Sequence, residues 1–144
     1  MPKSSTTVET FVSPDEFREI ILAWDKYPEF LPQVKKVAVL ERAKGSGRAT
    51  FWVEVSVGGM EVKTEYTCKY TWTDKDISWK LESSPTLTTN EGFWKLEETS
   101  DGETKAYYES EIVTSLPIPL ELQKLFADQE LPKMMQLFRD RAED

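Results

Sequence analysis

The sequence predicts an α+β fold in which a curved antiparallel sheet packs against a long C-terminal helix. Between residues 34 and 116 apolar and polar residues alternate with the period of two that is typical of strands. Apolar stripes with helical spacing lie before this region and after it. Because short turns join the strands, they are expected to pair antiparallel. With 144 residues, the chain is expected to form one domain over 1–144 with a substantial core.

The first predicted elements are a strand and a helix. The segment "TTVETFV", residues 6–12, is typical of a short strand. In "SPDEFREIILAW", Ser13 is the expected N-cap, Pro14 takes the first helical position, and Glu16 completes an S-x-x-E capping box. One apolar helix face follows, made of Phe17, Ile20, Ile21 and Trp24.

A stiff connector, "YPEFLP" (residues 27–32), follows this helix. Pro28 is suited to start a short helical turn and Pro32 to end it. Tyr27, Phe30 and Leu31 give the turn apolar surface that a polar loop would lack. The connector is therefore expected to pack against the rest of the domain.

Six further strands are predicted over 34–43, 48–57, 58–72, 76–83, 88–99 and 103–116. Gly58-Gly59 marks a tight turn, and further turns are expected at Lys75-Asp76, Ser84-Pro85 and Asp101-Gly102. The alternation is clearest after Gly59, where one face is predicted to point inward and the other to face water. That inward face carries Val62, Thr64, Tyr66, Cys68, Tyr70 and Trp72.

The last predicted element is a long amphipathic helix. Pro132 is expected to kink or restart this helix, because proline lacks an N–H donor and disfavours a helical conformation at Leu131. Its apolar stripe contains Leu122, Leu125, Phe126, Met134, Met135 and Phe138.

Composition argues against several classes of function. Acidic residues outnumber basic ones 26 to 18, the net charge is -8, and Lys and Arg are scattered, so nucleic acid is an unexpected partner. No apolar run is long enough to span a bilayer and the first 15 residues contain no apolar signal region, so we expect a soluble, cytoplasmic protein.

The sequence contains no histidine and one cysteine. This composition excludes Ser-His-Asp and Cys-His nucleophile arrangements, His-ligated metals and an internal disulfide. No metal and no cofactor are therefore expected, and any chemistry would depend on Tyr, Glu, Asp, Lys, Arg or bound water.

The element order, "YPEFLP" after the first helix, "NEGFWKLEE" in a late strand and "LFRDRAED" at the end resemble the START-like SRPBCC superfamily over nearly the whole chain. The chain is most similar to the polyketide cyclase/dehydrase or coenzyme-Q-binding START-domain group, which includes the ribosome-association toxins. This resemblance implies a helix-grip, Bet v 1-like fold with a cavity for a hydrophobic ligand between sheet and C-terminal helix. It also implies that the connector forms a wall of the cavity mouth. The residues alone leave open a connector that simply fills the core.

Several aromatic residues share the predicted inner face, where buried Tyr and Trp need partners for their polar atoms. Two adjacent methionines on the facing helix suit an adaptable wall. Close core packing is the alternative explanation for every one of these residues. The candidate ligand-binding residues are Tyr27, Phe30, Tyr66, Cys68, Tyr70, Trp79, Trp94, Tyr108, Met134, Met135 and Phe138.

Three functions remain compatible with the sequence. Carriage of a lipid, isoprenoid quinone or polyketide-like molecule is favoured by the aromatic inner face. A polyketide cyclase or dehydrase would use the phenols of Tyr66, Tyr70 and Tyr108 to polarise a carbonyl, but no general base can be assigned, and Cys68 lacks a neighbour that would lower its pKa. An interaction protein like the ribosome-association toxins is disfavoured by the negative charge. Catalytic residues and oligomeric state are not predicted.

Overall fold

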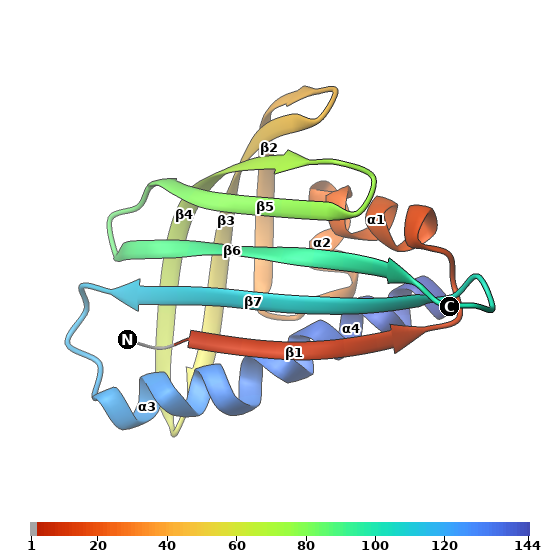
Figure 1. Ribbon diagram of the computed structural model, residues 1–144. Helices are drawn as coiled ribbons and strands as arrows, with labels where there is room; N and C mark the ends of the chain where they lie inside the picture. Colours follow the sequence, from red (N-terminus) through yellow and green to blue (C-terminus); the bar gives the residue numbers. More distant parts are fainter. Residues whose placement is uncertain (1–2) are drawn as a thin grey trace.

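The computed structural model describes residues 3–144 (Figure 1). The predicted α+β order is confirmed, with one strand and three short helical segments preceding six more strands and a segmented C-terminal helix. The elements are β1 (Lys3–Thr10), α1 (Pro14–Leu22), η1 (Trp24–Lys26), α2 (Tyr27–Phe30), β2 (Val34–Ala43), β3 (Ser46–Val57), β4 (Met60–Trp72), β5 (Asp76–Ser83), β6 (Leu87–Glu98), β7 (Thr104–Thr114), α3 (Leu120–Leu125), η2 (Phe126–Glu130) and α4 (Leu131–Glu143).

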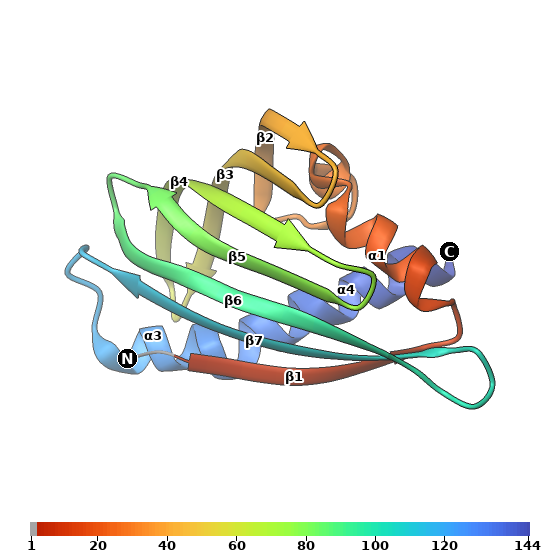
Figure 2. The ribbon, with the colours of Figure 1, turned by 45° about the horizontal axis from the view of Figure 1, so that its top comes forward.

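The strands form one antiparallel seven-stranded sheet in the order β1-β7-β6-β5-β4-β3-β2. Consecutive strands from β2 to β7 are neighbours, and β1 closes the other edge against β7. Register shifts in β2 and in the β4–β5 and β6–β7 pairs indicate bulges, which bend strands and increase their twist. Figure 2 shows the C-terminal helical segments crossing one side of the bent sheet, with α1 near their end. This is the predicted helix-grip arrangement.

The first helix starts where the sequence predicts. The Ser13 hydroxyl accepts a hydrogen bond from the Glu16 backbone N–H at 3.3 Å, and Pro14 lies in the first turn. The predicted capping box forms only in part, because the Glu16 carboxylate accepts from the Ser13 hydroxyl at 3.4 Å instead of bonding the Ser13 backbone. The N-cap therefore holds the start of the helix as expected.

The first strand was placed too late by the sequence prediction. It runs over Lys3–Thr10, whereas the prediction gave residues 6–12. The chain leaves the sheet at Phe11 because it must turn into the N-cap at Ser13, while β7 extends far enough to pair Lys3 with Glu111. Val12 remains buried, and its carbonyl accepts a hydrogen bond from the Thr104 hydroxyl at 2.8 Å.

The other strands follow the predicted alternation closely. Strands β2 and β5 have the predicted bounds, and the tight turn between β3 and β4 is confirmed, with φ angles of 56° at Gly58 and 82° at Gly59. Positive φ at both central positions suits glycine and matches the twist of a hairpin. The ring of Trp79 lies over Gly92, where an added Cβ would come within 2.2 Å of the Glu109 carbonyl oxygen.

The C-terminal helix is divided into two parts by a π-helical segment, η2. The Leu131 N–H bonds the Phe126 carbonyl, five residues earlier, and α4 starts with Pro132 in its first turn. Since Pro132 has no N–H, the Ala127 carbonyl lacks its π-helical donor as well as its α-helical one. The Ser4 hydroxyl donates to this carbonyl at 2.7 Å instead. Strand β1 thus stabilises the break in the helix, and the predicted restart at Pro132 is confirmed.

Candidate functional site

A cavity of about 190 Å³ lies between the bent sheet and the C-terminal helix. One water molecule needs about 10–15 Å³ of such space, so this volume is far larger than a packing defect. Strands β2 to β7 supply one wall, and the helical segments α1, α2, α3, η2 and α4 supply the other. The cavity therefore occupies the position that the family resemblance implied.

The inner end of the cavity, beside α1 and α4, is aromatic and buried. We define the inner end by Tyr27, Phe51, Tyr70, Trp94, Tyr108 and Phe138, all of which are buried. Their rings make edge or tilted contacts: Trp94 lies 5.1 Å from Tyr108 and 5.5 Å from Phe138, between ring centroids. Such pairs stabilise the packing beyond the area they bury, so the inner end is a rigid wall.

The outer end, beside the β3–β4 turn and α3, is aliphatic and partly exposed. We define the outer end by Val55, Met60, Val62, Leu116, Ile118 and Leu122, which all line the cavity. Met60 is 36% exposed, and the Leu122 side chain contacts the turn at Gly58. None of the residues of α3, all of which are described, is buried. The outer end is therefore less deeply buried than the inner end.

The connector forms the corner between α1 and β2. The Tyr27 hydroxyl donates a hydrogen bond to the Ile21 carbonyl, and its ring contacts Phe138 at 5.3 Å, so α2 is fixed against both α1 and α4. Tyr27 and Leu31 line the cavity at the inner end. The prolines and aromatic residues of this segment thus give a helical corner that is both core and cavity wall. Its place at the cavity mouth stays a prediction.

Phe30 and Cys68 are the two candidate residues that do not line the cavity. Phe30 contacts Phe138 at 5.3 Å and lies under the Arg141 guanidinium, because α2 turns this ring toward α4. The rings of Tyr66 and Tyr70, on either side of Cys68 in β4, both pack against Phe51, whereas the Cys68 thiol is fully buried outside the cavity lining.

Burial raises the pKa of the Cys68 thiol to about 12. A protonated thiol that is fully buried is a poor nucleophile, so Cys68 acts as a small hydrophobic residue. This agrees with the sequence, in which nothing beside Cys68 could lower its pKa.

The other candidates do surround the cavity: Tyr27, Tyr66, Tyr70, Trp79, Trp94, Tyr108, Met134, Met135 and Phe138. Their role in ligand binding stays a prediction. Sequence reasoning missed Asn90, which lines the cavity and is 5% exposed. It shares the alternation of Gly92 and Trp94 in β6, so the period of two could have identified it as an inward polar residue.

The polar groups of the cavity are neutral at physiological pH. Burial raises the pKa of Tyr108 to about 12, with a smaller opposite effect from Ser110. Burial also raises the pKa of Tyr66 and of Tyr70, and the neighbouring phenols add to the rise. Each phenol therefore keeps its proton and presents an O–H donor.

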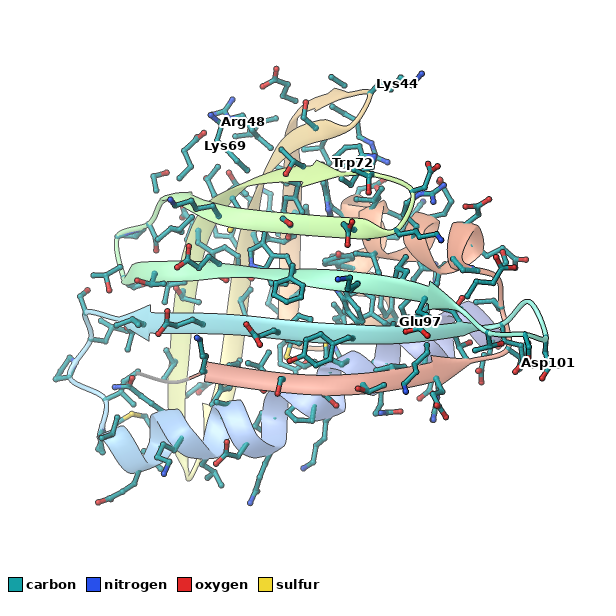
Figure 3. The ribbon with its side chains drawn as sticks, viewed as in Figure 1. Lys44, Arg48, Lys69, Trp72, Glu97 and Asp101 are labelled. Atoms are coloured by element: carbon teal, nitrogen blue, oxygen red, sulfur yellow. The ribbon has the colours of Figure 1, made fainter. Side chains whose placement is uncertain are left out.

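Charged side chains lie elsewhere. The residues that line the cavity include no Asp, Glu, Lys or Arg. Figure 3 shows charged side chains around the outside of the sheet, among them Arg48 and Lys69 on neighbouring strands. Arg48 donates two hydrogen bonds to the Glu82 carboxylate, at 2.9 and 2.6 Å. The alternation of β3 to β5 thus separates a charged outer face from an uncharged inner one.

Residues 3–144 contain no group of three Cys, Asp or Glu side chains placed to hold a metal ion. No helix in this part of the chain is long and apolar enough to cross a membrane.

Comparisons with known proteins agree with this geometry. Residues 12–139 match the family model described as "Polyketide cyclase / dehydrase and lipid transport". No curated protein sequence matches the chain. Many solved structures share the fold.

A protein from Thermus thermophilus is 15% identical, with a TM-score of 0.82 and 98% of this chain and 97% of that chain covered. A START superfamily protein from Mycobacterium smegmatis is 18% identical, with a TM-score of 0.79 and coverage of 98% and 97%. An aromatase/cyclase from Streptomyces sp. R1128 is 18% identical, with a TM-score of 0.66 and coverage of 98% and 86%. At these identities the likeness concerns the fold.

Proposed function

Because the chain belongs to the family described as polyketide cyclase / dehydrase and lipid transport, we propose that it binds and carries a hydrophobic small molecule in the cavity between the sheet and the C-terminal helix. The observation that carries this proposal is the cavity itself, about 190 Å³ of space lined mainly by aromatic and aliphatic side chains. Protein interiors normally contain few voids larger than a water molecule, so a space of this size suits an apolar ligand.

The two ends of the cavity suggest how a ligand is held. The buried rings of the inner end are fixed by their mutual contacts, whereas Met134 and Met135 on α4 can adapt their flexible side chains to different shapes. The ligand would reach these residues through the outer end, past Met60 and α3. Lipids, isoprenoid quinones and polyketide-like molecules are the classes that fit such a surface.

A cyclase or dehydrase acting in the same cavity is the second candidate. The three protonated phenols, Tyr66, Tyr70 and Tyr108, favour it, because they could donate hydrogen bonds to a carbonyl that gains negative charge. The cavity lining offers no carboxylate, lysine or histidine as a general base, so carriage is the function that we propose first. If a polyketide ketone incubated with the protein were recovered as a cyclised or dehydrated product, the enzymatic function would be favoured over carriage.

The same proposal places the protein in the cytoplasm and without a nucleic-acid partner. The location follows from the expectation that the sequence has no membrane-spanning run and no signal region. The nucleic-acid part rests on the net charge of -8 and on Lys and Arg residues that are scattered among Asp and Glu. Ribosome binding that weakened steeply with salt would contradict it.

The cavity can be tested with N-phenyl-1-naphthylamine, a neutral apolar dye that becomes fluorescent when it leaves water. The parent protein should give a saturable, one-to-one rise in fluorescence. Met135→Trp should lose most of this signal, because the larger side chain extends from α4 into the cavity. Leu120→Trp is the matched control, since Leu120 is 60% exposed and does not line the cavity.

The loss of stability caused by Met135→Trp distinguishes a cavity from a close-packed core. In a cavity the added volume finds space, whereas overpacking a filled core costs about 1–3 kcal/mol of stability. A parent protein without saturable dye binding, together with a clearly destabilised Met135→Trp variant, would show that the aromatic face is only core. Native mass spectrometry of the purified protein would then identify any ligand that it already carries.

A further inference from the structure

The two edges of the sheet differ in how they are covered. Strand β1 packs against α4 and η2, and the Ser4 hydroxyl ties it to the Ala127 carbonyl. Strand β2 pairs with β3 and packs against η1 and α2, but residues 35–43 form no backbone hydrogen bond outside the β2–β3 pair in the part of the chain that the structure describes. Figure 1 shows the β2–β3 hairpin extending beyond the other strands. An open edge offers a row of N–H and C=O groups to another strand.

This edge is basic in an otherwise acidic protein. Residues 34–48 contain five basic residues and one acidic residue, a net charge of +4, whereas the rest of the chain contains 13 basic and 25 acidic residues, a net charge of -12. The basic residues of the stretch are Lys35, Lys36, Arg42, Lys44 and Arg48. Figure 3 shows Lys44 at one corner of the molecule, away from Glu97 and Asp101. The charge at this corner is therefore complementary to an acidic partner.

Most of this positive charge is not neutralised within the chain. Arg48 is paired with Glu82 at 2.6 Å. Lys35, Lys36 and Lys44 are exposed, and none of the three forms an ion pair with any residue in 3–144. These lysines can therefore pair with carboxylates from outside the molecule.

Two large apolar side chains are exposed among these lysines. Val39 is 43% exposed and Leu40 is 51% exposed, and they are adjacent in β2. An apolar centre with a charged rim is the usual composition of a protein interface. A phosphate polymer would find no use for these two side chains, so the surface fits a polypeptide better than nucleic acid.

The backbone and the alternation of β2 define what kind of polypeptide fits. Val37 and Val39 pair with buried residues of β3 and so lie on the inner face, whereas Lys36 pairs with Trp52 on the outer face, with Nζ 4.9 Å from the indole ring. Register shifts on both sides leave residues 36–39 as the regular part of the edge. A short strand added here would continue both faces if it alternated apolar and acidic side chains.

Other occupants fit this edge less well. A second copy of the chain would place a charge of +4 against +4, which is repulsive. A lipid surface would leave the N–H and C=O groups of the edge without partners, which is costly in an apolar environment. An acidic strand supplies both the opposite charge and the missing backbone partners.

We propose that β2 is a docking edge for an extended acidic segment of a partner protein, which adds to the sheet as a further strand beside residues 36–39. Its carboxylates pair with Lys35, Lys36 and Lys44, and its apolar side chains lie beside Val37 and Val39. This inference does not depend on the proposed function, because the edge is separate from the cavity between sheet and helix.

A fluorescein-labelled peptide, Glu-Val-Glu-Val-Glu-Val-Glu, tests the edge by fluorescence anisotropy. It should bind the parent protein saturably and more weakly as salt is added, and Lys-Val-Lys-Val-Lys-Val-Lys should not bind. Lys35→Glu/Lys36→Glu should weaken binding about tenfold, because two attractions become repulsions. Leu40→Ser, which leaves the charge unchanged, should weaken it about threefold.

Lys95→Glu/Lys124→Glu is the matched control. Both lysines are exposed and lie outside β2 and β3, and the change in net charge is the same. This variant should bind the acidic peptide within about twofold of the parent, because charges at a distance are screened by salt. Equal losses in the two double variants would overturn the docking edge, since they would show a response to net charge alone.

Strand addition has its own readout in amide hydrogen exchange. The acidic peptide should slow exchange within residues 36–39, because their outward amides gain partners. Binding without slower exchange in β2 would overturn the strand pairing, and no binding of the peptide would overturn the docking edge as a whole. So would vesicles of equal parts phosphatidylglycerol and phosphatidylcholine that bind the parent but not Lys35→Glu/Lys36→Glu while the peptide binds neither, because the edge would then serve a lipid surface. None of these results bears on dye binding in the cavity, so the proposed function is tested separately.

Discussion

The two ends of the cavity are built from different residues for different tasks. The inner end consists of buried aromatic rings held by α1, α2 and α4, whereas the outer end consists of aliphatic side chains beside α3, which has no buried residue among residues 120–125. Large rings packed on each other contribute much to stability, and partly exposed aliphatic side chains contribute little. The difference teaches that one helix can stabilise the domain at one end and leave the cavity wall partly exposed at the other.

The π-helical segment η2 marks the boundary between these two tasks. On one side, α4 buries Leu131, Met135 and Phe138. On the other, α3 buries no residue, and its Leu122 lies against the β3–β4 turn at Gly58. Local openings involve regions with few buried apolar contacts. We therefore expect α3 to open without unfolding α4.

The largest effect is expected at the inner end, where Phe138→Ala removes a ring that contacts Tyr27, Phe30 and Trp94. The loss should cost about 3–5 kcal/mol of unfolding free energy, measured by urea denaturation. Leu120→Ala on α3 should stay within about 0.5 kcal/mol, because Leu120 is mostly exposed. Similar costs for both variants would contradict the division between the ends.

A closer comparison uses the same substitution on both sides of η2. Leu131 and Leu122 both line the cavity, but Leu131 is buried and Leu122 is only half-buried. Leu131→Ala should cost about 2–4 kcal/mol in a urea melt, and Leu122→Ala about 1 kcal/mol or less. Leu122→Ala should instead accelerate release of N-phenyl-1-naphthylamine in stopped-flow measurements. If Leu122→Ala destabilised the protein more than Leu131→Ala, the stable part of the helix would be α3 and not α4, which would contradict the division at η2.

The inner end should also make stability sensitive to alkaline pH. Burial raises the pKa of Tyr108 to about 12 in the folded state, above its ordinary value of about 10, so the folded protein holds this proton more tightly. The stabilisation is present below about pH 10 and is lost as the pH rises from 10 to 12, by about 1.4 kcal/mol per pH unit for one phenol. Urea midpoints at pH 8, 10 and 11 measure this slope, and Tyr108→Phe should make it shallower. An unchanged slope in that variant would contradict the assignment.

The smallest effect concerns the boundary itself. Ser4→Ala removes the donor to the Ala127 carbonyl and should cost about 1 kcal/mol, because this buried group loses its hydrogen bond. Ser5→Ala is the control, since Ser5 lies on the same strand but is exposed. Amide hydrogen exchange should increase in η2 and α3 of the Ser4 variant only. Uniform exchange changes along the whole helix would show that η2 is not a separate boundary.

The sequence predicted the fold well because its signals were local. Alternation gave the bounds of β2 and β5, glycines marked the hairpin turn, and Pro132 marked the restart of the last helix. The π-helical form of η2 could not be predicted, because it depends on a hydrogen bond from Ser4, far away in the sequence. The same limit explains why β1 was placed too late.

The candidate site was predicted in outline and missed in detail. Period-two alternation correctly predicted that Tyr66, Tyr70 and Trp94 point inward, but it could not show that Cys68 is buried without lining the cavity. It also gave no measure of the space left between sheet and helix. Asn90 was not predicted, although the alternation of β6 places it on the same face as Gly92 and Trp94.

The hydrogen bond between Ser4 and Ala127 joins residues 123 positions apart, and β1 pairs along its length with β7. During translation, β1 leaves the ribosome long before β7 and η2 are synthesised. Val8, on the buried side of β1, therefore cannot pair with Ala106 until β7 has been made. Contacts of such long range form late in folding, because a large loop must close first. The cavity therefore exists only after the C-terminal helix has been synthesised, and incomplete chains would present its aromatic wall to other proteins as a surface prone to aggregation.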